Sequence, residues 1–111
     1  MEYTYDDFWD GTGWQEIWRD FVKKLKEKTK GEVKIIDTKE KFGTLRVYLS
    51  SHSEDIDEMV RSLEKKSREV CIECGKPTKY VANDSWIVYL CEECAEKVMR
   101  RNGIPMKKIE H

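Results

Sequence analysis

Two C-x-x-C motifs constrain this chain more than any other feature of its sequence. Cys71 and Cys74 form the first pair and Cys91 and Cys94 the second, separated by a stretch of hairpin length. This spacing is typical of a zinc site with four thiolate ligands, because each motif turns two sulfur atoms towards one point and two motifs complete a tetrahedron. Gly75 follows the first pair and suits the positive φ that such a turn often needs. We therefore predict one structural zinc ion per chain.

Other uses of the cysteines stay open but are less favoured: an iron–sulfur cluster, a redox motif or two disulfide bonds. Disulfides belong to oxidising compartments, and the start of the chain, Met1-Glu2-Tyr3, does not resemble a secretory signal. A thioredoxin-like motif would be single and would lie in a βαβ unit. A catalytic zinc ion keeps one position open, usually beside histidine ligands, whereas four thiolates close the shell and the only histidines are His52 and His111.

The chain before the cysteines has the periodicity of two amphipathic helices. Thr12 and Gln15 have the spacing of a capping box, which predicts a helix over residues 13–30. Ser53 is placed to cap a second helix that continues almost to the first cysteine pair. We expect one hydrophobic core, formed by Trp14, Ile17, Trp18, Phe21, Leu45, Val47, Ile56, Val60 and Leu63.

Runs rich in β-branched and aromatic residues predict two hairpins. Residues 33–38 and 44–50 form the first, and residues 80–82 and 86–90 form the second, which leads directly into Cys91. A short helix over residues 94–101 follows and ends before Pro105. The predicted fold class is α+β, with an α-β-β-α core, a C-terminal zinc ribbon and a short terminal helix.

The length of 111 residues suits one compact unit, although 39% of the residues are charged and only 39% are hydrophobic. We divide the chain into an N-terminal arm (residues 1–13), the core (residues 14–70) and the zinc ribbon with a basic tail (residues 71–111), and expect them to fold as one cooperative unit. The chain contains no apolar run of membrane-spanning length, so we expect no membrane partner and a cytoplasmic location in a bacterial cell.

The N-terminal arm combines acidic and aromatic residues without any basic residue. Such a segment can bind a basic groove on a protein partner, with aromatic side chains as anchors and carboxylates as steering charges. The alternative is that the aromatic rings pack on the domain while the acids face water. The candidate partner-binding residues are Tyr5, Asp6, Asp7, Trp9 and Asp10.

Basic residues gather on the first helix and near the C-terminus, although the formal net charge is only -1. Both segments are candidates for contacts with phosphate groups, and a DNA- or RNA-binding regulator is the alternative to a protein-binding role. Glu73, Glu92 and Glu93 lie between or beside the cysteine ligands, where nucleic-acid-reading ribbons more often carry basic residues. The candidate nucleic-acid contacts are Lys23, Lys24, Lys26, Lys30, Arg100 and Arg101.

An enzymatic role has little support in the sequence. The chain has no P-loop, no G-x-S-x-G motif and no histidine paired with a serine or cysteine nucleophile. Asp6, Asp7 and Asp10 could bind Mg²⁺ through their carboxylates, but nothing else accompanies them. We therefore expect a protein that is not an enzyme and that acts by binding a macromolecular partner, more readily a protein than a nucleic acid.

Three stretches resemble small uncharacterised proteins of phages and prophages. They are K-E-K-F-G-T-L-R (39–46), C-I-E-C-G-K-P (71–77), which follows a helix ending in E-K-K-S-R, and L-C-E-E-C-A (90–95). In those proteins a KEKFG-type hairpin precedes a zinc-ribbon-like end with four cysteines. The resemblance covers residues 14–98 and implies a small accessory protein in a bacterial cytoplasm that binds a host component. It implies no catalytic residues.

Overall fold

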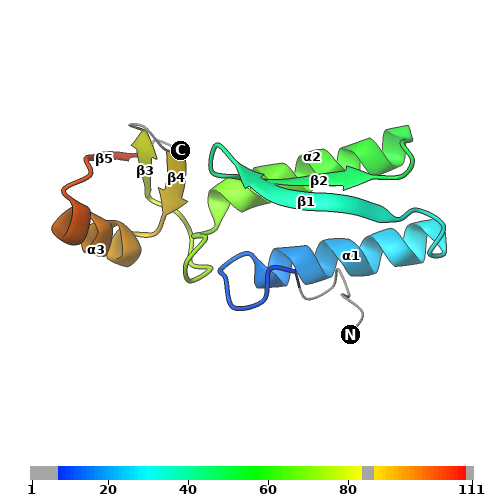
Figure 1. The fold of residues 1–111 in the computed structure, drawn as a ribbon, viewed down its shortest axis with the longest axis horizontal. Coiled ribbons are helices and arrows are strands. Elements are labelled where there is room, and N and C mark those ends of the chain that lie inside the picture. The colour runs from blue at the N-terminus through cyan, green and yellow to red at the C-terminus, as the bar shows by residue number, and fades with distance from the viewer. Residues whose placement is uncertain (1–7, 84–86, 110–111) are drawn as a thin grey trace.

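The computed structural model describes residues 8–83 and 87–109 and has an α+β fold (Figure 1). Parts of two predicted features, the N-terminal arm and the turn of the second hairpin, lie outside these ranges. In chain order the elements are α1 (Gln15–Thr29), β1 (Ile35–Lys41), β2 (Thr44–Leu49), α2 (Glu54–Glu69), β3 (Tyr80–Asn83), β4 (Ile87–Leu90), α3 (Glu92–Asn102) and β5 (Met106–Lys108).

The first part of the fold is a two-layer arrangement of α1 and α2 against the β1–β2 hairpin (Figure 1). The two strands are antiparallel, with Thr38 opposite Val47 and Lys39 opposite Arg46. Most of the predicted core residues are buried between the layers, and Ile17 is partly buried against them, as is Val60. The buried cluster contains Trp14, Trp18, Phe21, Val22, Leu25, Leu45, Val47, Leu49, Ile56 and Leu63.

The second part is a separate three-stranded sheet with the order β4-β3-β5 and α3 beside it. Its core contains two of the cysteines, together with Ala82, Val88, Leu90 and Ala95. Ile72 packs against both this cluster and the first one, so it joins the two cores. The metal-binding cysteines therefore lie in a small unit with apolar packing of its own.

The C-terminal tail differs from the prediction, because part of it is a strand. Helix α3 ends at Gly103, whose φ is 64°, and Pro105 follows before the chain returns along β3 as β5. Val81 lies opposite Lys107, and the amide of Ile109 donates a hydrogen bond of 2.8 Å to the carbonyl of Lys79. Three residues of mixed polarity carry too weak a pattern to predict a strand without knowledge of its partner.

The start of α1 also differs in detail from a capping box. Trp14 occupies the N-cap position, and the Thr12 hydroxyl accepts a hydrogen bond from its amide while donating to the carbonyl of Trp9. The Gln15 side chain accepts a hydrogen bond from the amide of Gly11. The predicted pair of side chains thus caps the turn before the helix. Helix α2 begins as predicted, because the Ser53 hydroxyl accepts a hydrogen bond from the amide of Ile56.

A two-residue turn connects β1 to β2 and approaches the second sheet. Phe42 and Gly43 both have positive φ values, 54° and 76°, between the paired residues Lys41 and Thr44. A Cβ atom at Gly43 would lie 3.0 Å from the carbonyl oxygen of Ile87 in β4, so the turn lies directly beside that strand. Among the described helices, none has the length and hydrophobicity needed to cross a membrane.

Candidate metal centre

The four cysteine sulfur atoms meet at one point between the end of α2, the β3–β4 sheet and the start of α3. All four Sγ atoms of Cys71, Cys74, Cys91 and Cys94 lie within 4.8 Å of one another, and none is in a disulfide bond. The Sγ atoms of Cys74 and Cys91 are 3.4 Å apart. Tetrahedral coordination at a Zn–S distance of about 2.3 Å requires S···S separations of about 3.8 Å. The cluster is positioned to hold a metal ion.

Backbone hydrogen bonds shape the first cysteine turn. The Gly75 amide donates to the carbonyl of Cys71 over 2.8 Å, and the Cys71 amide donates to the carbonyl of Lys76 over 2.7 Å. Gly75 has the predicted positive φ, 81°. Val70 then forms an isolated antiparallel bridge with Pro77, so helix α2 enters the turn without a flexible linker. The local geometry therefore fixes both sulfur atoms of this pair.

The second cysteine turn is also the first turn of α3. Cys91 is the N-cap residue, and its sulfur accepts a 3.5 Å hydrogen bond from the amide of Cys94. The Ala95 amide donates to the carbonyl of Cys91 over 2.9 Å. A helix N-terminus carries a partial positive charge, so it stabilises the thiolate form of a cysteine at the cap. Helix α3 thus positions the second cysteine pair and also contributes to the electrostatics of the site.

The burial of the ligands is unequal. Cys71 and Cys91 are 0% and 3% exposed, Cys94 is partly buried and Cys74 is exposed. Burial and the neighbouring thiols of Cys91 and Cys71 raise the pKa of Cys94 far above its usual value. Burial also raises the pKa of Cys74. For Cys91, hydrogen bonds from the Cys94 amide and the Cys74 thiol outweigh burial and lower the pKa. The proximity of the four sulfur atoms means that thiolates here would repel one another, and a bound cation would offset that repulsion.

The glutamates beside the ligands are engaged with lysines at the rim of the site. Lys76 forms an ion pair of 3.1 Å with Glu93, and Lys79 one of 3.6 Å with Glu92. All four side chains are largely exposed, so each pair contributes little to stability. The rim is therefore mixed in charge, and it does not provide the basic surface that a nucleic-acid-reading ribbon would use.

A contact that the sequence does not predict joins the N-terminal segment to the first cysteine turn. The Gly13 amide donates a 2.6 Å hydrogen bond to the carbonyl of Ile72. A Cβ atom at Gly13 would lie only 1.8 Å from the Cys71 carbonyl oxygen and 2.4 Å from the Gly75 amide nitrogen. Only glycine fits at this position. Apart from the glycine itself, the surrounding D-G-T-G-W sequence contains no pattern that predicts the contact. The metal centre is therefore packed directly on the start of α1.

The described part of the N-terminal arm packs on the domain. The Trp9 indole nitrogen donates a 3.1 Å hydrogen bond to the Thr38 hydroxyl, and its ring contacts Trp14 with centroids 5.0 Å apart. Asp10 forms a 2.8 Å ion pair with Arg19. For Trp9 these contacts favour the packing alternative over a free anchor. The candidate residues Tyr5, Asp6 and Asp7 lie outside the described residues.

The candidate phosphate contacts are not gathered on one surface. Arg100 and Arg101 are exposed on α3, at one end of the long axis, whereas Lys30 follows α1 at the other end (Figure 1). Lys23 and Lys26 line a shallow surface depression on α1 with Arg19 and Val22. The two basic segments therefore cannot act as one continuous interface.

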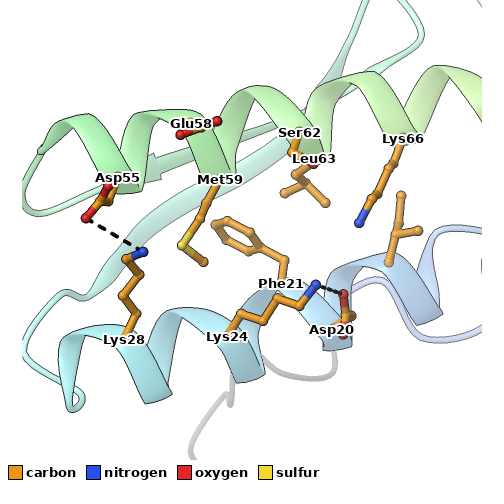
Figure 2. Close-up of a pocket in the computed structure, with 11 residues that line it drawn as sticks. Asp20, Phe21, Lys24, Lys28, Asp55, Glu58, Met59, Ser62, Leu63 and Lys66 are labelled. Carbon is orange, nitrogen blue, oxygen red and sulfur yellow. Dashed lines mark ion pairs between the residues drawn. The ribbon is translucent and has the colours of Figure 1, made fainter.

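A groove between α1 and α2 is another concave feature of the described surface. It has a volume of about 270 Å³ and an apolar floor that includes Phe21, Met59 and Leu63 (Figure 2). Lys24 pairs with Asp20 on its rim, and Lys28 of α1 reaches Asp55 of α2 at 3.7 Å, as Figure 2 shows. The rim alternates basic and acidic groups, so its charge favours no single class of ligand.

Comparisons with known proteins add no assignment to this picture. The chain matches no protein-family model, no curated protein and no solved structure.

Proposed function

We propose that the chain is a small zinc-stabilised protein that acts by binding a macromolecular partner. The observation that supports the zinc ion is the convergence of four cysteine sulfur atoms, all within 4.8 Å of one another, from two separate turns. A tetrahedral set of four sulfur ligands is typical of zinc or of iron–sulfur centres. Zinc is favoured because two C-x-x-C turns joined by a hairpin form the usual frame of a structural zinc site.

The proposed zinc ion is structural. Four protein thiolates fill a tetrahedral shell, which leaves no position for water or substrate. Binding of zinc to such sites is worth about 10–16 kcal/mol in isolated peptides, which matches or exceeds the whole stability of a small domain. The ion would hold the end of α2, the second sheet and α3 together, and a catalytic role is not part of the proposal.

Elemental analysis and a change of metal test the zinc ion. We expect one zinc ion per purified chain, and tetrahedral thiolate absorption in the visible range after replacement of zinc by Co²⁺. Cys74→Ser should weaken zinc affinity at least tenfold, because it removes a ligand. Glu73→Gln, the matched control between the same two cysteines, should retain the zinc ion. Protein that is purified with stoichiometric iron, or free of metal with four chelator-insensitive thiols, contradicts the proposal.

The binding role is supported by what surrounds the metal. The proposed ion is structural, and the described surface offers an open sheet face and a shallow groove rather than a deep pocket of convergent polar groups. The resemblance to phage and prophage proteins supports an accessory role in a bacterial cell. The acidic and aromatic residues of the N-terminal arm favour a protein partner. The packing of Trp9 on the domain weakens the interpretation that this arm is the binding site.

A further inference from the structure

The outer face of the β1–β2 hairpin is open to solvent and carries aromatic and basic side chains. Alternate residues of each strand point to this face, away from α1 and α2. Tyr48 on β2 lies opposite Asp37, and Arg46 lies opposite Lys39. Tyr48 is 43% exposed, and Phe42 at the turn is 62% exposed. These are two of the few large hydrophobic side chains that the described surface exposes.

A lysine ammonium group lies over each exposed ring, on one of its two faces. The Nζ atom of Lys39 is 5.3 Å from the centre of the Tyr48 ring, and that of Lys41 is 5.7 Å from the centre of the Phe42 ring. Within the described residues, neither lysine pairs with a carboxylate. A planar aromatic face beside a positive charge is the arrangement that binds a nucleobase and its phosphate together.

Phe42 is an unfavourable residue for the position that it occupies. Its φ of 54° is in the left-handed region, which is uncommon for a bulky side chain, and two-residue turns of this kind prefer Asn-Gly. The residue is therefore both strained and exposed, and folding alone would favour asparagine. A strained residue of this kind often reflects a functional requirement.

The acidic groups near this face are already engaged. The Asp37 carboxylate accepts a 2.9 Å hydrogen bond from the Thr38 amide, and that of Glu40 accepts one of 3.0 Å from the Gly43 amide. Glu64 of α2 holds Arg46 at 3.4 Å.

The helix surface that adjoins this face is basic. Arg61 and Arg68 are exposed and lie one turn on either side of Glu64, which is the residue of α2 that contacts β2 through Arg46. Basic side chains therefore continue from the open face of the hairpin onto α2.

We propose that the outer face of the β1–β2 hairpin binds single-stranded nucleic acid. Phe42 and Tyr48 stack on bases, while Lys39 and Lys41 contact phosphates. The two rings are separated along the hairpin by roughly 17 Å, so one strand of several nucleotides spans both. This inference rests on the proposed binding function and supplies the class of partner.

The geometry of the face favours the binding of single-stranded nucleic acid over a duplex. Exposed rings on a flat sheet can stack only on bases that are not already stacked in a helix. The rings of Phe42 and Tyr48 lie close to the sheet surface, together with the lysines. They do not project from the protein as a recognition helix would. We therefore expect duplex DNA of the same length to bind at least tenfold more weakly.

Fluorescence anisotropy with the full, zinc-loaded chain tests the inference. The probes are labelled 12-nucleotide oligo(dT) and oligo(U), which distinguish DNA from RNA as the source of the strand, and a labelled 12-base-pair duplex. We expect saturable binding of at least one single strand, with log K falling as log[salt] rises with a slope of about -1.4, since single strands give about -0.7 for each of the two phosphate contacts. Lys39→Gln should reduce that slope by about 0.7.

Variants at the two rings test the stacking without disturbing the fold. Phe42→Asn suits the positive φ, so it should keep or raise the melting temperature while it weakens binding about fivefold or more. Tyr48→Thr replaces the ring with another residue of high β-propensity in β2 and should weaken binding to a similar degree. Lys66→Gln, an exposed lysine on the groove side of α2, is the matched control, and its affinity should stay within twofold of the parent protein.

Three results would overturn the inference. The first is no binding of either single strand at 50 mM salt with 100 µM protein while the zinc ion is present. The second is a tighter complex with the duplex. The third is unchanged affinity in both Phe42→Asn and Tyr48→Thr. Because zinc content is measured on the same sample, a failure of this inference is distinguishable from a failure of the proposed zinc-stabilised fold.

Discussion

The amide of Gly13 donates a 2.6 Å hydrogen bond to the carbonyl of Ile72, one of the two residues between the first two cysteines. This bond joins the segment before α1 to the metal centre, although the two are far apart in the sequence. Gly75 of the same turn lies on the other side of the contact, where its own Cβ position would be 3.2 Å from the Gly13 carbonyl oxygen. Two glycines therefore allow two backbone segments to lie against each other.

Gly13→Ala tests this contact. The new Cβ atom would lie 1.8 Å from the Cys71 carbonyl oxygen, so one of the backbone segments must move. We expect a loss of about 2–3 kcal/mol in the free energy of unfolding, and a lower zinc affinity. Gly11→Ala is the control, since it has open space around it and costs only about 1 kcal/mol through its positive φ. Equal losses in the two variants, measured by denaturant unfolding, would contradict the packing role of Gly13.

Trp18→Ala tests the main core. The Trp18 side chain is 0% exposed and its ring contacts Phe21, with centroids 5.8 Å apart. Removal of such a ring should lower the free energy of unfolding by about 3–5 kcal/mol. A small domain has a total of about 5–15 kcal/mol, so chemical denaturation should show a variant that is partly unfolded in water. A loss below about 1 kcal/mol is inconsistent with a buried Trp18.

Trp9→Ala distinguishes packing of the arm from recognition by the arm. Trp9 is partly buried and bonded to Thr38, so we expect a loss of about 2 kcal/mol of stability and a lower melting temperature. Thr38→Val should cost about 1–2 kcal/mol, because the same hydroxyl also donates to the carbonyl of Arg46. If Trp9→Ala melts like the parent protein, the ring is not a packing element and partner recognition by the arm is favoured again.

Ser67→Ala tests a buried polar contact between α2 and β2. The Ser67 hydroxyl accepts a 3.0 Å hydrogen bond from the Leu45 amide, which points away from β1 and has this side chain as its partner. Loss of the acceptor leaves a buried amide unsatisfied, at a cost of about 1–3 kcal/mol. Ser62→Ala on the exposed side of the same helix should change stability by less than about 0.5 kcal/mol. Similar melting curves for the two variants would show that this hydrogen bond contributes nothing.

Removal of the metal should act first on the second sheet. Its buried cluster is small and includes two of the ligands, whereas the cluster between the helices and the first hairpin contains no ligand. We expect a chelator to abolish hydrogen-exchange protection in β3, β4 and α3 and to weaken it in the first turn of α1 through Gly13. Protection that persists in β3 after complete metal removal would contradict this order. A single melting transition of the metal-loaded protein would confirm that the chain folds as one cooperative unit.

The sequence was sufficient where one local pattern determines the structure. The i, i+3, i+4 spacing around Trp18 predicted α1 and its buried face, and the two C-x-x-C motifs predicted a cluster that brings Cys71 and Cys91 together. Each signal depends on side chains that are close in the sequence, either within one helix or within one C-x-x-C motif. The fold class is confirmed for the same reason, since the helices and hairpins each form from contiguous residues.

The sequence was insufficient where a contact joins distant segments. Strand β5 forms because it pairs with β3. A glycine is required at position 13 because the Cys71 backbone packs against it. Local periodicity reveals neither of these partners. The charge pattern is limited for a related reason. It placed Lys30 and Arg100 on basic segments without showing that these segments lie at opposite ends of the molecule (Figure 1).

The two edges of the second sheet have consequences for self-association. An unpaired strand edge is a template on which a second copy of a chain can add a strand. One edge, β4, has the Phe42–Gly43 turn directly beside it at Ile87, and the other, β5, consists of Met106 followed by Lys107 and Lys108. A covering turn obstructs the first edge, and repulsion between lysines of two approaching copies disfavours pairing at the second. Both features therefore disfavour edge-to-edge pairing of the small sheet that carries the cysteines.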